Sequence, residues 1–136
     1  MKELEEGENN LGFSAQAFKM RHAYTDHGYR VTLEGKTIAY SGDSGICENS
    51  KLLSKDADLL IHESSYVKVP LDENWGHVDS RQAATLAKES NVKQLILTHF
   101  DASEFTSLDQ RKEAEKQAQE IFPNTTAAED DLVITI

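Results

Sequence analysis

The sequence predicts an α/β fold in which a mixed β-sheet carries its helices on one face. Two patterns lead to this fold class: short strand-like segments with period-two alternation come first, and apolar runs alternating with helix-period segments follow. The 136 residues are 38% hydrophobic and 28% charged, which suits one domain with a core and a polar surface. We therefore expect antiparallel strands early in the chain and parallel strands later.

Composition excludes several classes of protein. With 14 Lys and Arg against 24 Asp and Glu, the formal charge is -10, which argues against sequence-independent nucleic-acid binding. No apolar stretch approaches the ~20 residues of a membrane helix. The single cysteine, Cys47, excludes an internal disulfide framework and fits a reducing compartment, so we expect a cytoplasmic protein. A substrate phosphate remains compatible with this acidity if bound metal ions reverse the local field.

The first part of the chain predicts a leader and then a hairpin. Residues 1–11 are acidic and polar with no apolar period, and we expect them to be a disordered leader. Residues 12–136 form the expected domain. A first strand begins at Gly12, and strands over 28–33 and 36–41 follow it, joined by a turn at Glu34-Gly35. The apolar face of the first strand is expected to contain Phe13, Ala15 and Ala17.

The rest of the chain predicts alternating helices and strands. Asp79 or Ser80 can cap one helix, and Ser107 with Gln110 forms a capping-box pattern at the start of another. The apolar stripe of this last helix would include Leu108, Ala114, Ala118 and Ile121. The expected helices are 49–55, 79–90 and 107–121, and the expected strands are 58–63, 92–98, 125–128 and 132–136.

Three residues that can bind metal lie where predicted strands meet loops. His22 follows the segment 18–21 (FKMR), His99 follows the apolar run 95–98 (LILT), and Asp43 follows the strand that ends near Ser41. Ligands of α/β proteins collect at strand ends, and imidazole with carboxylate is a donor set that suits zinc. No two histidines have the i, i+4 or His-x-His spacing of a self-sufficient zinc motif, so spacing alone leaves plain turn or surface roles open.

Short sequence segments around these residues favour a metal site. The segments 22–31 (HAYTDHGYRV), 40–44 (YSGDS) and 76–99, which runs from Gly-His to a strand ending in His99, resemble motifs of the metallo-β-lactamase superfamily. The match is strongest to its ribonuclease Z branch. Two further segments, 60–63 (LIHE) and 122–128, are similar in order and spacing. The resemblance therefore covers residues 18–136, and its five strings occur in the family's order.

The resemblance implies roles for five matched residues. His22 and His99 would each ligate a metal ion, and Asp43 would bridge two ions. His77 would lie beside the scissile phosphate and protonate or stabilise the leaving oxygen. Glu63 would orient His77 by accepting its N–H. The expected catalytic residues are thus His77 and Glu63, and the expected cofactor is a divalent metal, with zinc the first candidate.

Three other reactive side chains receive no such role. His27 matches no functional position and is expected in a loop. His62 points away from Glu63 on the same strand and is expected to be structural. Cys47 lies near a helix start and is expected to be a small buried side chain rather than a nucleophile.

The sequence departs from the family in one large respect. The family's first motif, His-x-His-x-Asp-His, does not occur in these residues. We therefore expect residues 12–136 to form the C-terminal half of a metallo-β-lactamase αββα sandwich. Two metal ions would occupy the whole fold, and one or none this chain alone. The expected partner is the N-terminal half of the same fold or a second copy of this chain, which would make a homo-oligomer.

The resemblance implies a metal-dependent phosphodiesterase that activates water, inactive as this chain alone. The run between His22 and Asp43 is too short for an RNA-gripping arm and has no Lys/Arg cluster, which favours a small phosphodiester. The alternative is a non-catalytic α/β interaction module that has kept relic metal ligands. A third reading, Asp43 as the phosphoacceptor of a receiver-like domain, ranks below both because the required early acidic pair is missing.

Overall fold

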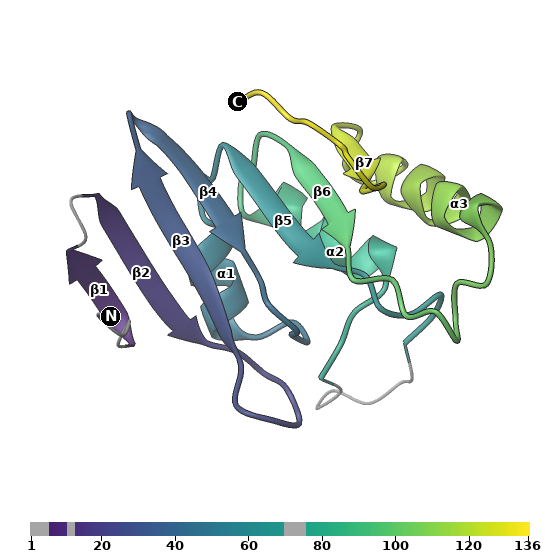
Figure 1. Ribbon diagram of the computed structural model, residues 1–136, viewed down its shortest axis with the longest axis horizontal. Coiled ribbons are helices and arrows are strands. Elements are labelled where there is room, and N and C mark those ends of the chain that lie inside the picture. Colours follow the sequence, from purple (N-terminus) through teal and green to yellow (C-terminus); the bar gives the residue numbers. More distant parts are fainter. Residues whose placement is uncertain (1–5, 11–12, 70–75) are drawn as a thin grey trace.

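A mixed seven-stranded sheet dominates the computed structural model, which describes residues 6–10, 13–69 and 76–136. The strand order follows the sequence, from β1 to β7 (Figure 1). Strands β1 to β4 pair antiparallel and β4 to β7 pair parallel, which confirms the predicted mixed sheet. The strands are β1 (Gly7–Asn10), β2 (Ser14–Lys19), β3 (His27–Leu33), β4 (Lys36–Tyr40), β5 (Leu59–Glu63), β6 (Leu95–Thr98) and β7 (Thr125–Ala127).

Three helices connect the parallel strands of the described chain and lie on one face of the sheet (Figure 1). They are α1 (Glu48–Ser54), α2 (Ser80–Glu89) and α3 (Leu108–Gln119). Asp79, one of the two expected candidates, caps α2, and Ser107 caps α3 through the predicted capping box with Gln110. None of the helices in the described residues is long and apolar enough to cross a bilayer.

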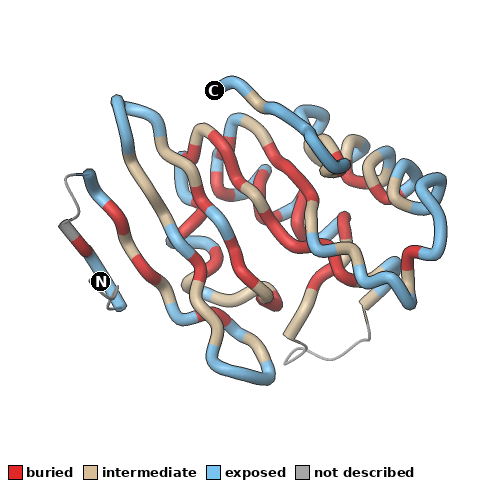
Figure 2. The backbone as a smooth tube through the Cα atoms, viewed as in Figure 1, coloured by how far each residue is buried: buried red, intermediate tan, exposed pale blue. Residues whose placement is uncertain are grey.

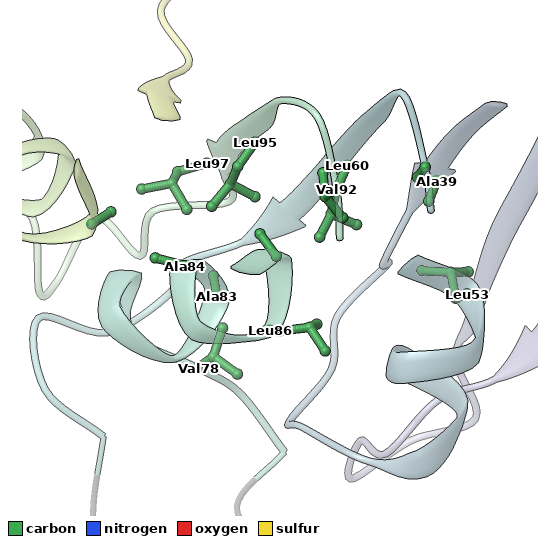
Figure 3. Packing of buried hydrophobic residues seen from close by; sticks show 13 residues of the cluster. Ala39, Leu53, Leu60, Val78, Ala83, Ala84, Leu86, Val92, Leu95 and Leu97 are labelled. Atoms are coloured by element: carbon green, nitrogen blue, oxygen red, sulfur yellow. The ribbon is translucent and has the colours of Figure 1, made fainter. Parts of the chain in front are cut away.

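The core lies between the helices and one face of the sheet. Leu60 on β5 and Leu95 and Leu97 on β6 face Ala83, Ala84 and Leu86 of α2 (Figure 3). The tube coloured by burial shows the same concentration of buried residues on the central strands and inner helix faces (Figure 2). Alanine recurs in this cluster, which lets helix and sheet backbones approach closely.

The opposite sheet face has an apolar surface that no helix of the described residues covers. Ala39 belongs to the core, so its strand neighbours Ile38 and Tyr40 point the other way. The register pairs Tyr29 with Tyr40 and Val31 with Ile38, which puts all four side chains on this face. Leu33 extends the same row and is 57% exposed. We call this row of Tyr29, Val31, Leu33, Ile38 and Tyr40 the open sheet face.

The predicted hairpin turn is confirmed. Glu34 and Gly35 have φ angles of 51° and 77°, the pair of positive values that a two-residue type I′ turn requires. Glycine tolerates this conformation without strain. The turn fixes the register between β3 and β4, and with it the composition of the open sheet face.

Several expectations about the chain ends need correction. Part of the expected leader, Gly7–Asn10, forms the edge strand β1, because pairing with β2 satisfies its backbone without any apolar period. Residues 1–5 and 11 of the expected leader lie outside the described residues. The expected strand over 132–136 does not form, because the chain turns out of the sheet where Leu132 N–H donates to Glu129 O and Asp131 has φ 64°. Leu108 is 58% exposed rather than part of the apolar stripe of α3.

Candidate metal centre

The polar residues predicted from the sequence converge at one edge of the sheet. β2 and β4 are both antiparallel to β3, and β5 and β6 run parallel to β4, so these four strands point the same way. His22, Asp43, Glu63 and His99 stand at or just beyond their carboxyl ends. This is the edge at which α/β sheets bind ligands.

A cluster of nitrogen and oxygen donors occupies this edge. One ligand atom each from His22, Asp26 and Asp43 lies within 4.8 Å of the other two, and all three residues are half-buried. His99 Nε2 lies 3.3 Å from Asp43 Oδ1, which adds a second imidazole beside the same carboxylate. Imidazole and carboxylate together suit zinc and similar divalent ions, so these residues fit the expected metal.

Beside the cluster, Glu63 is a buried carboxylate with a full set of donors. Its side chain is 1% exposed. Oε1 accepts the Ser44 N–H at 2.6 Å and faces His77 Nδ1 at 2.8 Å. Oε2 accepts the Ser65 hydroxyl at 2.7 Å and the N–H groups of Ser65 and Val78 at 3.3 Å. Glu63 thus connects the Asp43 loop, the end of β5 and the segment before α2 through hydrogen bonds to one carboxylate.

His77 links this carboxylate to the donor cluster. Its Nε2 lies 3.2 Å from His22 Nε2, and its ring stacks on that of His99 at 6.3 Å. Tyr24 N–H lies 3.4 Å from His22 Nδ1, His77 Nδ1 faces the Glu63 carboxylate, and the Nε2 atoms of the two imidazoles face each other. A continuous chain of hydrogen bonds therefore runs from the donor cluster to Glu63.

Two glycines let the loops of the site approach closely. Gly42 has φ 60°, and a Cβ there would lie 2.7 Å from the His27 carbonyl oxygen. A Cβ on Gly76 would lie 3.2 Å from His22 Cα, so this glycine lets the His77 segment approach His22. His99 itself has φ 53°, a left-handed conformation that costs a non-glycine residue roughly 1–2 kcal/mol. Close packing and local strain here are typical of functional sites.

The surroundings of the cluster are acidic. Burial raises the pKa of Tyr40, and the charges of Asp43, Asp26 and Glu63 raise it further. The Ser103 hydroxyl lowers the pKa of Asp101. The backbone N–H of Ser103 and the nearby imidazoles of His99 and His77 lower this pKa as well. The concentration of carboxylates at one edge favours a bound cation over a bare anion.

The structure brings all five predicted site residues together: His22, Asp43, Glu63, His77 and His99. His62 lies on the helix side of β5, fully buried, with Nδ1 against the Glu63 carbonyl oxygen. His27 was expected in a loop but begins β3. Cys47 is the half-buried N-cap residue of α1.

Sequence reasoning missed Asp26 and Ser65. Asp26 stands inside the first matched string but was assigned no role, and its contact with Asp43 spans 17 residues. Ser65 follows Glu63 by two residues, and its hydroxyl donates to that carboxylate. A polar residue in a loop is ordinary, so only the proximity of these loops to predicted ligands could have singled them out.

Known proteins are similar to this chain in sequence. The family model described as a beta-lactamase superfamily domain matches residues 6–100. A ribonuclease Z of Ligilactobacillus salivarius is 44% identical over 99 residues, which are 71% of this chain and 31% of that protein. The ribonuclease Z of Bacillus subtilis is 37% identical over 105 residues, 76% of this chain and 34% of that protein. The chain thus spans about a third of the length of these curated relatives.

Solved structures share the fold. The metallo-beta-lactamase fold protein YhfI from Bacillus subtilis matches 90% of this chain and 49% of its own, with a TM-score of 0.76 and 28% identity. The short form of human tRNase Z matches 94% of this chain and 44% of its own, with a TM-score of 0.70 and 29% identity. The predicted fold class and resemblance are therefore confirmed, and the chain belongs to the beta-lactamase superfamily, where its curated relatives are ribonuclease Z proteins.

Proposed function

We propose that this chain supplies the C-terminal part of a metal-dependent phosphodiesterase centre of the ribonuclease Z type. One observation supports the proposal above all: two imidazoles, a carboxylate and a Glu63–His77 pair meet at one sheet edge, in the order that the family resemblance implies. The curated relatives carry the name ribonuclease Z. One sheet of the expected sandwich would supply only part of the ligands, which fits the match to 31% of the relative's length.

His22, Asp43 and His99 would hold the metal, and zinc is the first candidate because imidazole and carboxylate are among its usual ligands. A bound divalent ion polarises a phosphoryl oxygen and makes water acidic enough to attack near neutral pH. The carboxylate of Asp43 would be the ligand shared with both imidazoles, since it is clustered with His22 and its Oδ1 lies 3.3 Å from His99 Nε2. Further ligands would come from outside this sequence.

His77 and Glu63 would handle the proton of the leaving group. Glu63 accepts the Nδ1–H of His77 at 2.8 Å, which fixes the ring and leaves Nε2 facing the donor cluster. When both ring nitrogens are protonated, Nε2–H can donate to the leaving oxygen while Glu63 balances the added charge. His77 would then be the general acid and Glu63 its positioning residue.

The substrate we propose is a small phosphodiester. The chain has a formal charge of -10, and no Lys/Arg cluster lies between His22 and Asp43 to grip a long nucleic acid. Metal ions and the remaining part of the fold would supply the positive field. A single half-buried cysteine is consistent with a reducing compartment, and we propose the cytoplasm.

The partner would cover the open sheet face. Tyr29, Leu33 and Tyr40 are large apolar residues exposed there, and such a contiguous surface is typical of an interface. We propose that the N-terminal half of the same fold or a second copy of this chain covers it. The geometry of a sheet packed on a sheet suits either partner.

Joining this chain to the part of the Bacillus subtilis ribonuclease Z that it does not match would test the proposal. We expect the chimera to hydrolyse bis(p-nitrophenyl) phosphate when zinc or manganese is added. His77→Ala should lower kcat roughly 10²–10⁴-fold, the usual contribution of a general acid. His27→Ala is the matched control, because the His27 side chain lies at the same edge but contacts Glu6 and not His77 or Glu63. A folded, metal-loaded chimera without activity would contradict the proposal.

A further inference from the structure

Asp26 joins two loops of the site through its carboxylate. It stands between β2 and β3, four residues after His22. Its Oδ1 accepts the N–H of the next residue, His27, at 2.7 Å. Its Oδ2 accepts the N–H of Asp43 at 2.6 Å. Both oxygens thus bind backbone groups, and one of them belongs to a residue 17 positions away.

Gly42 completes this contact. A Cβ at Gly42 would lie 3.1 Å from each Asp26 carboxylate oxygen and 2.7 Å from the His27 carbonyl oxygen. The carboxylate therefore packs directly against the backbone of Gly42, which has φ 60°. Asp26 determines the path of the chain at the residue before Asp43, and only glycine fits that path.

The same contact determines where the Asp43 side chain can reach. Ligand atoms of His22, Asp26 and Asp43 lie within 4.8 Å of one another, and Asp43 Oδ1 lies 3.3 Å from His99 Nε2. With the Asp43 N–H held by Asp26, its carboxylate stays between His22 and His99. Two carboxylates this close repel each other, and a divalent cation beside them would offset that repulsion.

We propose that Asp26 is a positioning residue of the metal centre, which holds Asp43 in its ligating conformation by accepting the Asp43 N–H. The family resemblance assigns no role to this position. The inference rests on the proposed function, because it presumes that Asp43 ligates a metal. In this role Asp26 acts through the backbone of a ligand: its two oxygens accept the N–H groups of His27 and Asp43.

Asp58 offers a matched control. It lies at the opposite end of the sheet, before β5, where its Oδ2 accepts the Thr37 N–H at 2.8 Å and its Oδ1 pairs with Lys93 at 2.7 Å. Like Asp26 it connects two separate segments, here the residue before β5 and strand β4, by accepting a backbone N–H. Replacing Asp58 therefore removes a similar structural contact far from the donor cluster.

Cobalt(II) titration of the full chain, followed by its absorption spectrum, tests the inference. Asp26→Ala should weaken cobalt affinity about 10–100-fold, the usual effect of losing a group that orients a ligand. Asp26→Asn keeps one acceptor oxygen and should lose less. Both should keep the wild-type spectrum at saturation, because the ligands themselves are unchanged. Asp58→Asn should bind cobalt as the wild type does.

A second measurement needs no metal. Amide hydrogen exchange of the apo chain should show faster exchange at the Asp43 N–H in Asp26→Ala than in the wild type, with no such change in Asp58→Asn. Unchanged exchange at the Asp43 N–H, wild-type cobalt affinity in Asp26→Ala, or a changed cobalt spectrum of Asp26→Ala at saturation would each overturn the inference. A wild-type chain that binds no cobalt would overturn the metal centre itself, and the inference with it.

Discussion

Glu63 is a single buried residue that holds several segments of the site in place. Its carboxylate is buried and meets donors from three separate segments. A buried carboxylate is tolerated only when hydrogen bonds replace its hydration. At the residue scale, then, the orientation of His77 and the position of the Asp43 loop both depend on one side chain.

Replacing Glu63 with glutamine should destabilise the fold. The amide of Glu63→Gln offers one acceptor oxygen and two donor hydrogens, so several of the surrounding donors lose their partner. We expect the free energy of unfolding to fall by about 2–4 kcal/mol in urea denaturation. Glu89→Gln on the exposed face of α2 is the control. A loss no larger than that of the control would show that Glu63 does not organise these segments.

His62 predicts a pH dependence of stability. Burial lowers its pKa below the ordinary 6.5, although the Glu63 carbonyl and charge act in the opposite direction. Below pH 6.5 the unfolded chain therefore binds a proton that the folded chain resists, and stability falls as pH falls. We expect the wild type to lose up to about 1.4 kcal/mol per pH unit more than His62→Leu between pH 6.5 and 5. Parallel stability curves for the two proteins would contradict this.

At the scale of elements, strand direction and helix caps place the functional residues. Four strands pointing the same way bring their carboxyl ends to one edge. The cap of α2 follows directly after His77 and Val78, and Asp79 Oδ1 accepts the Gln82 N–H at 2.9 Å. The start of α2 is therefore mechanically connected to the imidazole of His77.

Removing this cap should affect both stability and the site. Asp79→Ala is expected to cost about 1 kcal/mol of unfolding free energy, and Ser107→Ala at the cap of α3 about the same. Only Asp79→Ala should also shift the ring resonances of His77 in an NMR spectrum. Equal His77 shifts in both variants, or in neither, would disprove the connection.

Local chemistry explains which elements the sequence could predict. The turn at Glu34-Gly35 and the cap at Ser107 depend on neighbours in sequence and were predicted correctly, and the cap of α2 was narrowed to Asp79 or Ser80, of which Asp79 is the one observed. The polar edge strand β1 was missed because only pairing with β2 makes it a strand. The strand predicted over 92–98 is shorter, since the Val92 and Lys93 N–H groups donate to Ala87 and Ala57 rather than to the sheet.

The site residues divide in the same way, into those that local sequence indicates and those that only tertiary contacts reveal. His22, Asp43 and His99 could be proposed because their strings resemble the family's motifs, and strand ends attract ligands. Asp26 could not, because its contact with Asp43 exists only once two loops fold together. Sequence patterns indicate which residue types can do chemistry, whereas the residues that position them emerge from tertiary packing.

On the scale of the whole molecule, the sheet has one covered and one open face. Helices bury the first, and Tyr29, Leu33 and Tyr40 remain exposed on the second. Large exposed apolar patches on a soluble domain mark interaction surfaces. This exposure supports the proposal that the rest of the fold or a second copy packs on the open sheet face.

We expect the chain on its own to self-associate through this face. Leu33→Glu should shift the mass measured by sedimentation equilibrium toward the monomer, because a charge there opposes burial. Leu108→Glu on α3 is the matched control, since that leucine is 58% exposed against 57% for Leu33. A wild-type chain that sediments as a monomer would contradict this prediction.

We expect this chain to bind a metal ion through the residues gathered at one sheet edge. The most direct test of this expectation is the zinc content of the purified chain, measured by mass spectrometry after dialysis, in the wild type and in Asp43→Ala. We predict about one zinc ion per wild-type chain and close to none in Asp43→Ala, with the same circular dichroism for both. No zinc in the wild type, or equal zinc in the two proteins, would contradict the account.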